Sequence, residues 1–335
     1  MAPAHDLSAG GDVLDRVRDC ARAALGEYDC HPDSSIELLN VSENATFLVT
    51  DPDRGQSVLR VHRLGYHTED EIASELTWMD ALRAEAGVRT PRVLAARDGR
   101  RIVAAADPGG AQRHCVRFEF LPGTEPAESA ADIVRHFAEL GEITARMHAH
   151  ARQWRRPGWF TRFHWDYPAA FGAEARWGRW QDGAGVGPAE RVILGRLDRT
   201  LEGRLRAFGT GPERYGLVHA DTRLANLLVH DGAVSVIDFD DSGFSWYLYD
   251  LGTSVSFFEH EPVVPALVDS WLAGYRTHGE VTAADETEIW TFIMFRRLLL
   301  VAWIGSHQAV DIAAELGADY TRDSCDLAER YLSTH

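Results

Sequence analysis

Short runs of apolar residues alternate with polar residues near the start of the chain. Residues 36–41, 46–50 and 57–62 each have the composition and periodicity of a short strand. Residues 51–55, Asp-Pro-Asp-Arg-Gly, separate the second run from the third and have the composition of a turn. Ahead of these runs, residues 13–25 repeat apolar side chains at helical spacing. The pattern predicts a helix followed by a small sheet.

The next segments add a second helix and two further strands to this region. Residues 69–84 begin with three acidic side chains, which favour the start of a helix, and they place Ile72 and Leu76 on one apolar stripe. Residues 101–105 and 115–120 are the two strand candidates that follow. The first 120 residues or so therefore predict a small sheet with one or two helices.

Beyond residue 124 the apolar pattern becomes mainly helical. Residues 121–124, Leu-Pro-Gly-Thr, form a natural boundary. Long helices are expected at residues 133–150, 286–304 and 309–332. Since a single core seldom grows past about 250–300 residues, a chain of 335 residues is expected to form two domains or lobes.

Composition narrows the possible functions. The chain has 34 basic and 51 acidic residues, and every basic residue is Arg because no Lys occurs. Walker-type phosphate loops and Schiff-base chemistry both need a Lys, so neither operates here in its usual form. The net charge of −17 argues against nucleic acid as a partner and is typical of a soluble enzyme.

Nothing in the sequence indicates export or insertion into a membrane. No basic segment followed by an apolar stretch opens the chain, and the longest apolar run, residues 298–304, is too short to cross a bilayer. The four cysteines, Cys20, Cys30, Cys115 and Cys325, are widely spaced and are expected to be free thiols. We therefore expect a cytoplasmic protein without a membrane partner.

Candidate chemistry is concentrated between residues 219 and 241. Residues 219–226 read His-Ala-Asp-Thr-Arg-Leu-Ala-Asn, and residues 238–240 read Asp-Phe-Asp. Between them, Asp-Gly at 231–232 separates two apolar runs, which predicts a hairpin with a two-residue turn. A ladder centred on that turn brings Asn226 and Asp238 to the same open end of the hairpin.

An amide oxygen and a carboxylate that converge in this way suit Mg²⁺, which takes oxygen ligands and usually keeps substrate phosphates in its shell. Asp221, in the loop that leads to the same end, is a further carboxylate that could orient or deprotonate a nucleophile. Phosphoryl transfer needs little more than such positioning and charge neutralisation. Asp and Asn also favour turns, but three of them at this spacing around the hairpin favour a phosphoryl-transfer site.

The H-x-D-x-x-x-x-N loop, the hairpin and the Asp-Phe-Asp after it resemble the catalytic core of kinase-like phosphotransferases. The chain is most similar to the aminoglycoside phosphotransferase superfamily, with its homoserine-kinase-like and stress-response-kinase branches. Residues 58–63, 217–228 and 236–241 carry the resemblance, which extends over roughly residues 35–330. It implies an α+β, protein-kinase-like fold of two lobes, with a small N-terminal antiparallel sheet lobe and a larger, mainly helical C-terminal lobe.

The resemblance also implies where the lobes meet. Residues 1–118 would form the N-terminal lobe, residues 119–124 the hinge and residues 125–335 the C-terminal lobe. A segment at 150–182, rich in Trp, would be an insert in the C-terminal lobe. The active site is then expected in the cleft between the lobes.

Catalytic roles follow from the resemblance, one position at a time. Asp221 would be the base that receives the proton of the acceptor hydroxyl. His219 would brace the loop by hydrogen bonds, and Asp250 would accept hydrogen bonds from the loop. Arg223, two residues after Asp221, would meet the γ-phosphate of ATP.

The same resemblance implies the residues that bind the cofactors, ATP and Mg²⁺. Asn226 and Asp238 would bind the metal, and Asp240 is a candidate to assist a second Mg²⁺, although a solvated role for Asp240 is equally open. The adenine edge would meet the backbone of three hinge residues, Glu119, Phe120 and Leu121.

Two departures from the family pattern concern the phosphates. The usual glycine-rich loop is absent, and residues 40–46 stand in its place, so Ser42, Asn44 and backbone amides would cover the phosphates. Arg60 stands where the family has a strand lysine, with Glu75 on the next helix as its expected ion-pair partner. An Arg can bind carboxylate and phosphate together, but it is bulkier than a Lys.

The resemblance leaves the acceptor open. We expect a hydroxyl on a small molecule such as an aminoglycoside, an amino alcohol or a sugar-like metabolite. A bacterial Ser/Thr protein kinase of the stress-response type and a catalytically silent nucleotide-binding module are the alternatives. The Trp-rich insert is interpreted either as an aromatic wall for the acceptor or as packing onto helices. The oligomeric state and the choice between ATP and GTP are not predicted.

Overall fold

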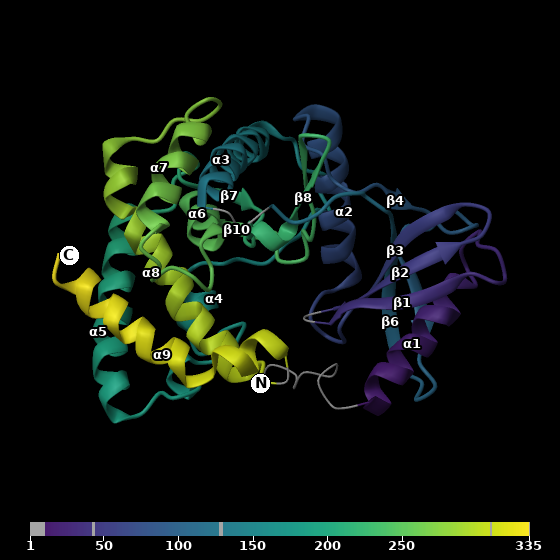
Figure 1. Ribbon diagram of the computed structural model, residues 1–335, viewed down its shortest axis with the longest axis horizontal. Helices are drawn as coiled ribbons and strands as arrows, with labels where there is room; N and C mark the ends of the chain where they lie inside the picture. The colour runs from purple at the N-terminus through teal and green to yellow at the C-terminus, as the bar shows by residue number, and fades with distance from the viewer. Residues whose placement is uncertain (1–10, 42–43, 127–129, 309, 335) are drawn as a thin grey trace.

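One antiparallel sheet forms the N-terminal lobe of the computed structural model, which describes residues 11–41, 44–126, 130–308 and 310–334 (Figure 1). The strands follow the order β1-β2-β3-β6-β4, and β5 also pairs with β6. These strands are β1 (Ser35–Val41), β2 (Ala45–Asp51), β3 (Gly55–Val61), β4 (Val93–Leu94), β5 (Val103–Ala106) and β6 (Gln112–Glu119). The five strands that the alternating pattern predicts are all present, with ends that shift by a few residues.

Two helices accompany the sheet. Helix α1 (Gly11–Leu25) buries its apolar stripe against the sheet, where Val17 and Cys20 contact the same core as Leu59. Helix α2 (Glu69–Glu85) starts at Thr68, whose side chain accepts a hydrogen bond from the Glu71 amide in a capping box. The α2 helix lies between the sheet and the helical lobe in Figure 1, and this position lets it carry a residue into the cleft.

The chain leaves the sheet at the end of β6 and enters a lobe made mainly of helices. These helices are α3 (Ala130–Gln153), α4 (Tyr167–Phe171), α5 (Pro188–Phe208), α6 (Leu248–Ser254), α7 (Val264–Tyr275), α8 (Ala283–Ser306) and α9 (Asp311–Leu332). Helix α3 packs closely against α7 because Gly274 has no side chain: a Cβ there would lie 1.8 Å from the Ala138 carbonyl oxygen.

Two short antiparallel pairs of strands lie within this lobe. Strand β7 (Tyr215–Val218) pairs with β10 (Gly243–Trp246), and β8 (Leu227–His230) pairs with β9 (Ala233–Val236). They hold the segment with the candidate chemistry between the helices and the sheet (Figure 1). The two-lobe α+β fold is therefore confirmed.

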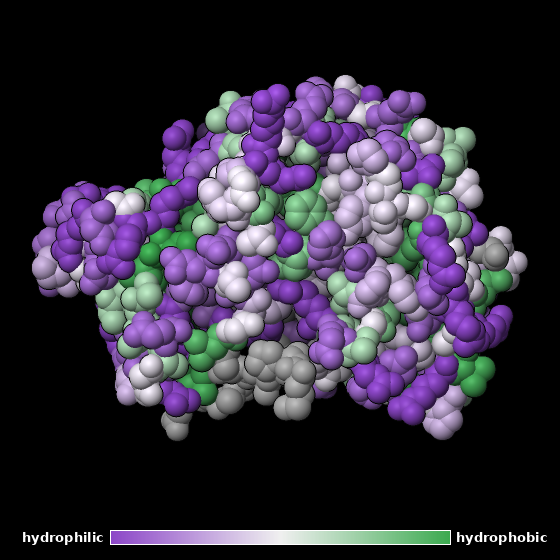
Figure 2. Space-filling model, turned by 180° about the vertical axis from the view of Figure 1, so that it is seen from behind, coloured by the Kyte–Doolittle hydropathy of each residue, from purple (hydrophilic) through white to green (hydrophobic). Residues whose placement is uncertain are grey.

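Helix α8 is long and apolar enough to cross a membrane, but 83% of its most apolar window is buried inside the protein. It packs as a core helix against α6, α5 and α9. The face of the molecule in Figure 2 is covered mainly by hydrophilic residues, with hydrophobic side chains in separate small groups. The four cysteines are free, and Cys20, Cys115 and Cys325 are buried, as expected.

Candidate active site

The β8–β9 hairpin brings the two expected metal ligands to one end. Both residues of its Asp-Gly turn have positive φ, 49° and 74°, the conformation that a two-residue turn of this kind requires. The Ile237 amide donates to the carbonyl oxygen of Asn226 at 2.9 Å, which continues the ladder beyond β8. The predicted register is confirmed, and Asn226 and Asp238 flank the open end.

Asp250, at the start of α6, holds the loop that follows β7. Its fully buried carboxylate accepts hydrogen bonds from the amides of His219, at 3.1 Å, and Ala220, at 2.7 Å. His148 contacts the same carboxylate through Nε2 at 2.9 Å. Ala220 has φ of 66°, which is rare for a residue with a side chain and is sustained here by these bonds. The expected contact between Asp250 and the loop is confirmed.

His219 ties the loop to the hairpin. Its Nε2 lies 3.1 Å from the carbonyl oxygen of Ile237, and the Asp221 amide lies 3.2 Å from its Nδ1. The ring also packs on Phe239, with 4.4 Å between centroids. His219 therefore contacts the backbone on both sides of the site, as the expected bracing role requires.

Asp221 is the carboxylate at the centre of the site. One oxygen accepts from Arg296 at 2.8 Å, and the other accepts from Asn226 Nδ2 at 2.7 Å and from Arg223 Nε at 3.2 Å. Burial opposes the charge of this carboxylate, but the positive charges of Arg223 and Arg296 hold its pKa below the usual value. Asp221 is thus ionised and fixed in orientation.

Arg296, from helix α8, is a site residue that the sequence reasoning missed. It also donates to Ser256 Oγ at 3.0 Å and to Tyr249 Oη at 3.2 Å, and its guanidinium lies 5.2 Å from the centre of the Trp177 ring. Its side chain is 3% exposed. The signal was an Arg within an apolar helix, because a buried cation needs an anionic partner.

The groups at the open end of the hairpin fit a magnesium ion. Asn226 uses Nδ2 to bond Asp221, so its amide oxygen remains available. Burial and the negative charges of Asp240 and Asp221 raise the pKa of Asp238, which indicates an excess of negative charge that a cation relieves. Among the described residues, no group of three His, Cys, Asp or Glu side chains could hold a metal. The protein would supply few ligands, as is usual where Mg²⁺ is bound together with phosphates.

Arg60 and Glu75 form the expected ion pair. Arg60 Nη1 lies 2.7 Å from Glu75 Oε1, and the Glu75 side chain is fully buried. Nη2 of the same Arg lies 3.2 Å from Asp238, and Nη1 lies 3.5 Å from Asp240. One guanidinium from the sheet therefore faces three carboxylates, of which one belongs to α2 and two follow the hairpin.

Asp240 lies deeper than Asp238 and has partners that the sequence did not indicate. His67 Nε2 lies 3.2 Å from one carboxylate oxygen, and His62 Nδ1 lies 3.6 Å from the other. Burial opposes the charge of Asp240, but His67 and Arg60 lower its pKa well below the usual value. Its contacts are with protein side chains, and its part in binding a second Mg²⁺ stays a prediction.

The residues expected to bind the nucleotide border the same cleft. Asn44 lines the cleft, and its side-chain oxygen accepts from the Arg63 amide at 3.2 Å, which ties the end of the segment between β1 and β2, where a glycine-rich loop would stand, to the residue that follows β3 by two positions. Ser42 lies outside the described residues. Three hinge residues also line the cleft: Glu119, Phe120 and Leu121.

The cleft between the lobes is a cavity of about 650 Å³ that contains Arg60, Asp221, Asn226 and Asp238. One end is bounded by the hinge and by the sheet. The other end, beyond Asp221, is lined mainly by apolar side chains of the C-terminal lobe: Trp177, Phe257, Leu300, Trp303, Val310 and Ile312. The site therefore offers separate ends for a nucleotide and for an acceptor.

The Trp-rich insert packs onto helices, and its part as an aromatic wall for the acceptor stays a prediction. Trp165, Trp177 and Trp180 are buried in the core that α5 and α8 form, so the insert packs onto helices. Trp177 also lines the acceptor end of the cleft. Trp159, in contrast, is 52% exposed and does not line it.

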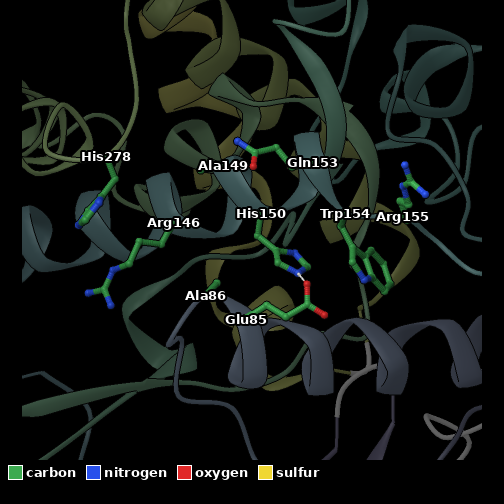
Figure 3. A pocket seen from close by; sticks show the side chains of 9 residues that line it. All are labelled: Glu85, Ala86, Arg146, Ala149, His150, Gln153, Trp154, Arg155 and His278. Carbon is green, nitrogen blue, oxygen red and sulfur yellow. Dashed lines mark hydrogen bonds and ion pairs between the residues drawn. The ribbon is translucent and has the colours of Figure 1, made fainter.

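A second hollow, of about 790 Å³, lies away from this chemistry, between the end of α2 and α3 (Figure 3). His150 points from α3 toward Glu85 of α2 and contacts it at 3.2 Å (Figure 3). Trp154 and Arg155 lie to the right of His150 in this view. No described residue of the expected site lines this hollow. The catalytic candidates therefore belong to the cleft alone.

Comparison with known proteins gives the family. Residues 36–286 match the model of the phosphotransferase enzyme family, also termed APH. Amicoumacin kinase of Bacillus subtilis (strain 168) is 24% identical over 313 residues, which cover 90% of this chain and 83% of the relative.

Two solved structures are similar over nearly the whole chain. The structure of a microcompartment-associated aminopropanol kinase is 49% identical, has a TM-score of 0.88 and is matched over 95% of this chain and 98% of its own. Amicoumacin kinase hAmiN, solved in complex with AMP-PNP, Ca²⁺ and Ami, is 23% identical with a TM-score of 0.77, and the match covers 94% of this chain and 95% of that one. This second likeness shows the fold.

The matching residues lie in both lobes and include the whole segment from Arg60 to the hairpin. The cofactors are ATP and Mg²⁺, and the acceptor is a small molecule. The chain belongs to the phosphotransferase enzyme family and is an ATP-dependent kinase that phosphorylates a hydroxyl group of a small molecule.

Proposed function

We propose that this protein transfers the γ-phosphate of ATP to the hydroxyl group of a small amino alcohol of the aminopropanol class. The observation that carries the proposal is the 49% identity to an aminopropanol kinase over 95% of the chain. A likeness of this degree includes the loop and hairpin around Asp221. An acceptor of a few atoms is also compatible with the short, mainly apolar end of the cleft beyond that residue.

Asp221 acts on the acceptor. The hydroxyl oxygen attacks the γ-phosphorus, its bond to phosphorus forms as the bond to the ADP oxygen breaks, and the hydroxyl proton passes to the Asp221 carboxylate. Because Arg223 and Arg296 lower the pKa of Asp221, the carboxylate is a weak base that mainly orients the hydroxyl and takes the proton late. Arg223 faces the transferring phosphoryl group, and Arg60 faces the α- and β-phosphates.

Asn226 and Asp238 are the residues that would hold Mg²⁺, with Asp240 as a candidate for assistance. The ion supplies positive charge that neutralises the phosphate oxygens of ATP. The protein adds guanidinium charge from Arg60 on the opposite side of the same carboxylates. His219 and Asp250 keep the loop in register with these groups.

The lobes keep the two substrates apart. Residues 1–118 form the N-terminal lobe, 119–124 the hinge and 125–335 the C-terminal lobe in this proposal, and the hinge backbone at Glu119 to Leu121 meets the adenine edge. Asn44 covers the phosphates from the strand-connecting segment. The protein works in the cytoplasm, where its substrates and its reduced cysteines are stable.

The experiment that tests the proposal is release of ADP from the purified protein with ATP, Mg²⁺ and a panel of acceptors. The panel contains amino alcohols, propanediol, an aminoglycoside and a cell-extract protein fraction. We expect aminopropanol to give the highest kcat/KM and Asp221→Asn to abolish its phosphorylation. Turnover of the aminoglycoside or the protein fraction, with none of the amino alcohols, would refute the proposed acceptor class.

A further inference from the structure

The segment that follows helix α6 contacts two arginines that bond Asp221. Ser256 accepts a hydrogen bond from Arg296 at 3.0 Å. The guanidinium of Arg223 lies over the Phe257 ring, 5.4 Å from the centre of the ring. Arg296 and Arg223 bond different oxygens of Asp221. The segment therefore supports the positive charges on two sides of this carboxylate.

Phe257 is held in a backbone conformation that a bulky residue rarely adopts, with φ of 77°. Two residues further on, the buried carboxylate of Glu259 pairs with Arg297 at 2.5 Å and accepts a hydrogen bond from Tyr320 at 3.1 Å. The Tyr320 ring also packs on the Phe257 ring, with 6.2 Å between centroids. A strained backbone persists only where its surroundings impose it, and here the buried ion pair and the packed rings do so.

Arg223 has terminal nitrogens that the protein leaves available. Its Nε donates to Asp221 at 3.2 Å, whereas no described residue accepts a hydrogen bond from Nη1 or Nη2. Arg223 and Phe257 both line the cleft. A single bond at Nε leaves the rest of a long side chain free to rotate, and order in such a side chain costs entropy. The Phe257 ring adds a second contact, at the guanidinium itself, that limits this rotation.

We propose that Phe257 is a positioning residue: its ring holds Arg223 so that the terminal nitrogens of the guanidinium meet the transferring phosphoryl group. The inference rests on the role proposed above for Arg223 and adds the residue that gives this side chain one orientation. The phosphoryl group in transit spreads its charge over three equatorial oxygens. Donors that are already oriented stabilise such charge best, because they do not reorganise during the reaction.

The Phe257 ring also borders the acceptor end of the cleft, so a role as a wall for the acceptor must be distinguished from positioning. A wall contributes to KM for the acceptor and acts independently of Arg223. Positioning contributes to kcat, and its contribution disappears once Arg223 is removed.

The test is a double-mutant cycle on kcat, measured by ADP release at saturating ATP and Mg²⁺. The acceptor is the best one of the panel above, or water if none of the panel is phosphorylated. We expect Arg223→Gln to lower kcat about 100- to 1,000-fold, as for loss of one donor to a developing charge. Phe257→Leu should lower kcat about 3- to 30-fold, the range expected for a cation–π contact. In the Arg223→Gln background, Phe257→Leu should change kcat less than about twofold.

Three further variants support the cycle. Phe257→Tyr keeps the ring and should retain most of the kcat that Phe257→Leu loses. Phe258→Leu is the matched control and should leave kcat unchanged, since Phe258 packs against the core between α3 and α7 and is not among the residues that line the cleft. Should Phe257→Leu fail to fold in thermal unfolding, Phe257→Met takes its place, because Met fills irregular space without a ring.

The outcomes separate this inference from the role proposed for Arg223. If Arg223→Gln leaves kcat unchanged, that role is wrong and the inference falls with it. If Arg223→Gln lowers kcat but Phe257→Leu has the same effect in both backgrounds, the ring acts independently of Arg223 and the inference alone is overturned. An effect of Phe257→Leu confined to KM for the acceptor, with kcat unchanged, would overturn it as well, since the ring would then be a wall.

Discussion

Replacement of Arg60 by Lys perturbs the contact between the sheet and the carboxylates at the open end of the hairpin. Arg60 bonds Glu75 through Nη1 at 2.7 Å and Asp238 through Nη2 at 3.2 Å. The two bonds start from different nitrogens, so a single ammonium keeps only one of them at full strength. The positive charge is retained, and the change therefore isolates the geometry of the guanidinium.

The expected size of the effect follows from this geometry. A hydrogen bond between charged groups contributes about 1.5–3 kcal/mol, and each ~1.4 kcal/mol corresponds to a factor of ten in affinity. Arg60→Lys should then raise KM for ATP about 10- to 100-fold. Arg60→Met goes further, because it leaves the fully buried Glu75 without its cation, and it should lower the free energy of unfolding by about 3–5 kcal/mol.

The assay is ADP release as a function of ATP concentration, combined with thermal unfolding of each variant. Arg22→Lys on α1 is the control, since that side chain is 62% exposed and pairs with the exposed Asp19. An unchanged KM for ATP in both Arg60→Lys and Arg60→Met would refute the reasoning. It would mean that the Arg60 contacts hold the two lobes together and contribute nothing to the binding of the ATP phosphates.

The other predictions concern catalysis, metal and pH. Asp221→Asn should lower kcat about 100- to 10,000-fold, the usual contribution of a general base, with KM for ATP nearly unchanged in steady-state kinetics. Asn226→Ala should raise the Mg²⁺ concentration needed for half-maximal rate about tenfold or more; an unchanged Mg²⁺ titration would exclude it as a ligand. Although burial opposes its charge, His67 and the Thr68 amide hold the pKa of Glu71 at about 2. The contribution of the Glu71 carboxylate to stability should be complete above about pH 4.3 and be lost as the pH falls toward 2. The unfolding midpoint of Glu71→Gln should therefore depend less steeply on pH over that range than the midpoint of the wild-type protein. An equally steep decline in both proteins would count against this assignment.

Local signals in the sequence, together with the resemblance to the family, were sufficient to predict the fold and part of the site. The Asp-Gly turn determines the hairpin register because only a few residues separate the paired positions, and Asn226 and Asp238 follow from it. The contact of Asp250 with the loop and the Arg60–Glu75 pair were both predicted from the resemblance to the family.

Contacts between distant segments could not be predicted in this way. Arg296 follows Asp221 by 75 residues and reaches it only because α8 packs under the loop. His67 meets Asp240 across the boundary of the two lobes, at a separation of 173 positions that no periodicity encodes. Burial alone explains why these groups matter, since inside the protein a charge without a partner is costly.

Three residues with side chains adopt left-handed backbone conformations at this site: Ala220, Asp238 and Phe257, with φ of 66°, 61° and 77°. Each of them borders the cleft or its catalytic loop. Such conformations cost of order 1–3 kcal/mol each, and glycine would adopt them without strain. Selection for thermal resistance alone would therefore favour glycine at these positions and would gradually loosen the loop that aims Asp221. In this kinase, thermal stability and the orientation of Asp221 therefore make opposite demands on the same three backbone angles.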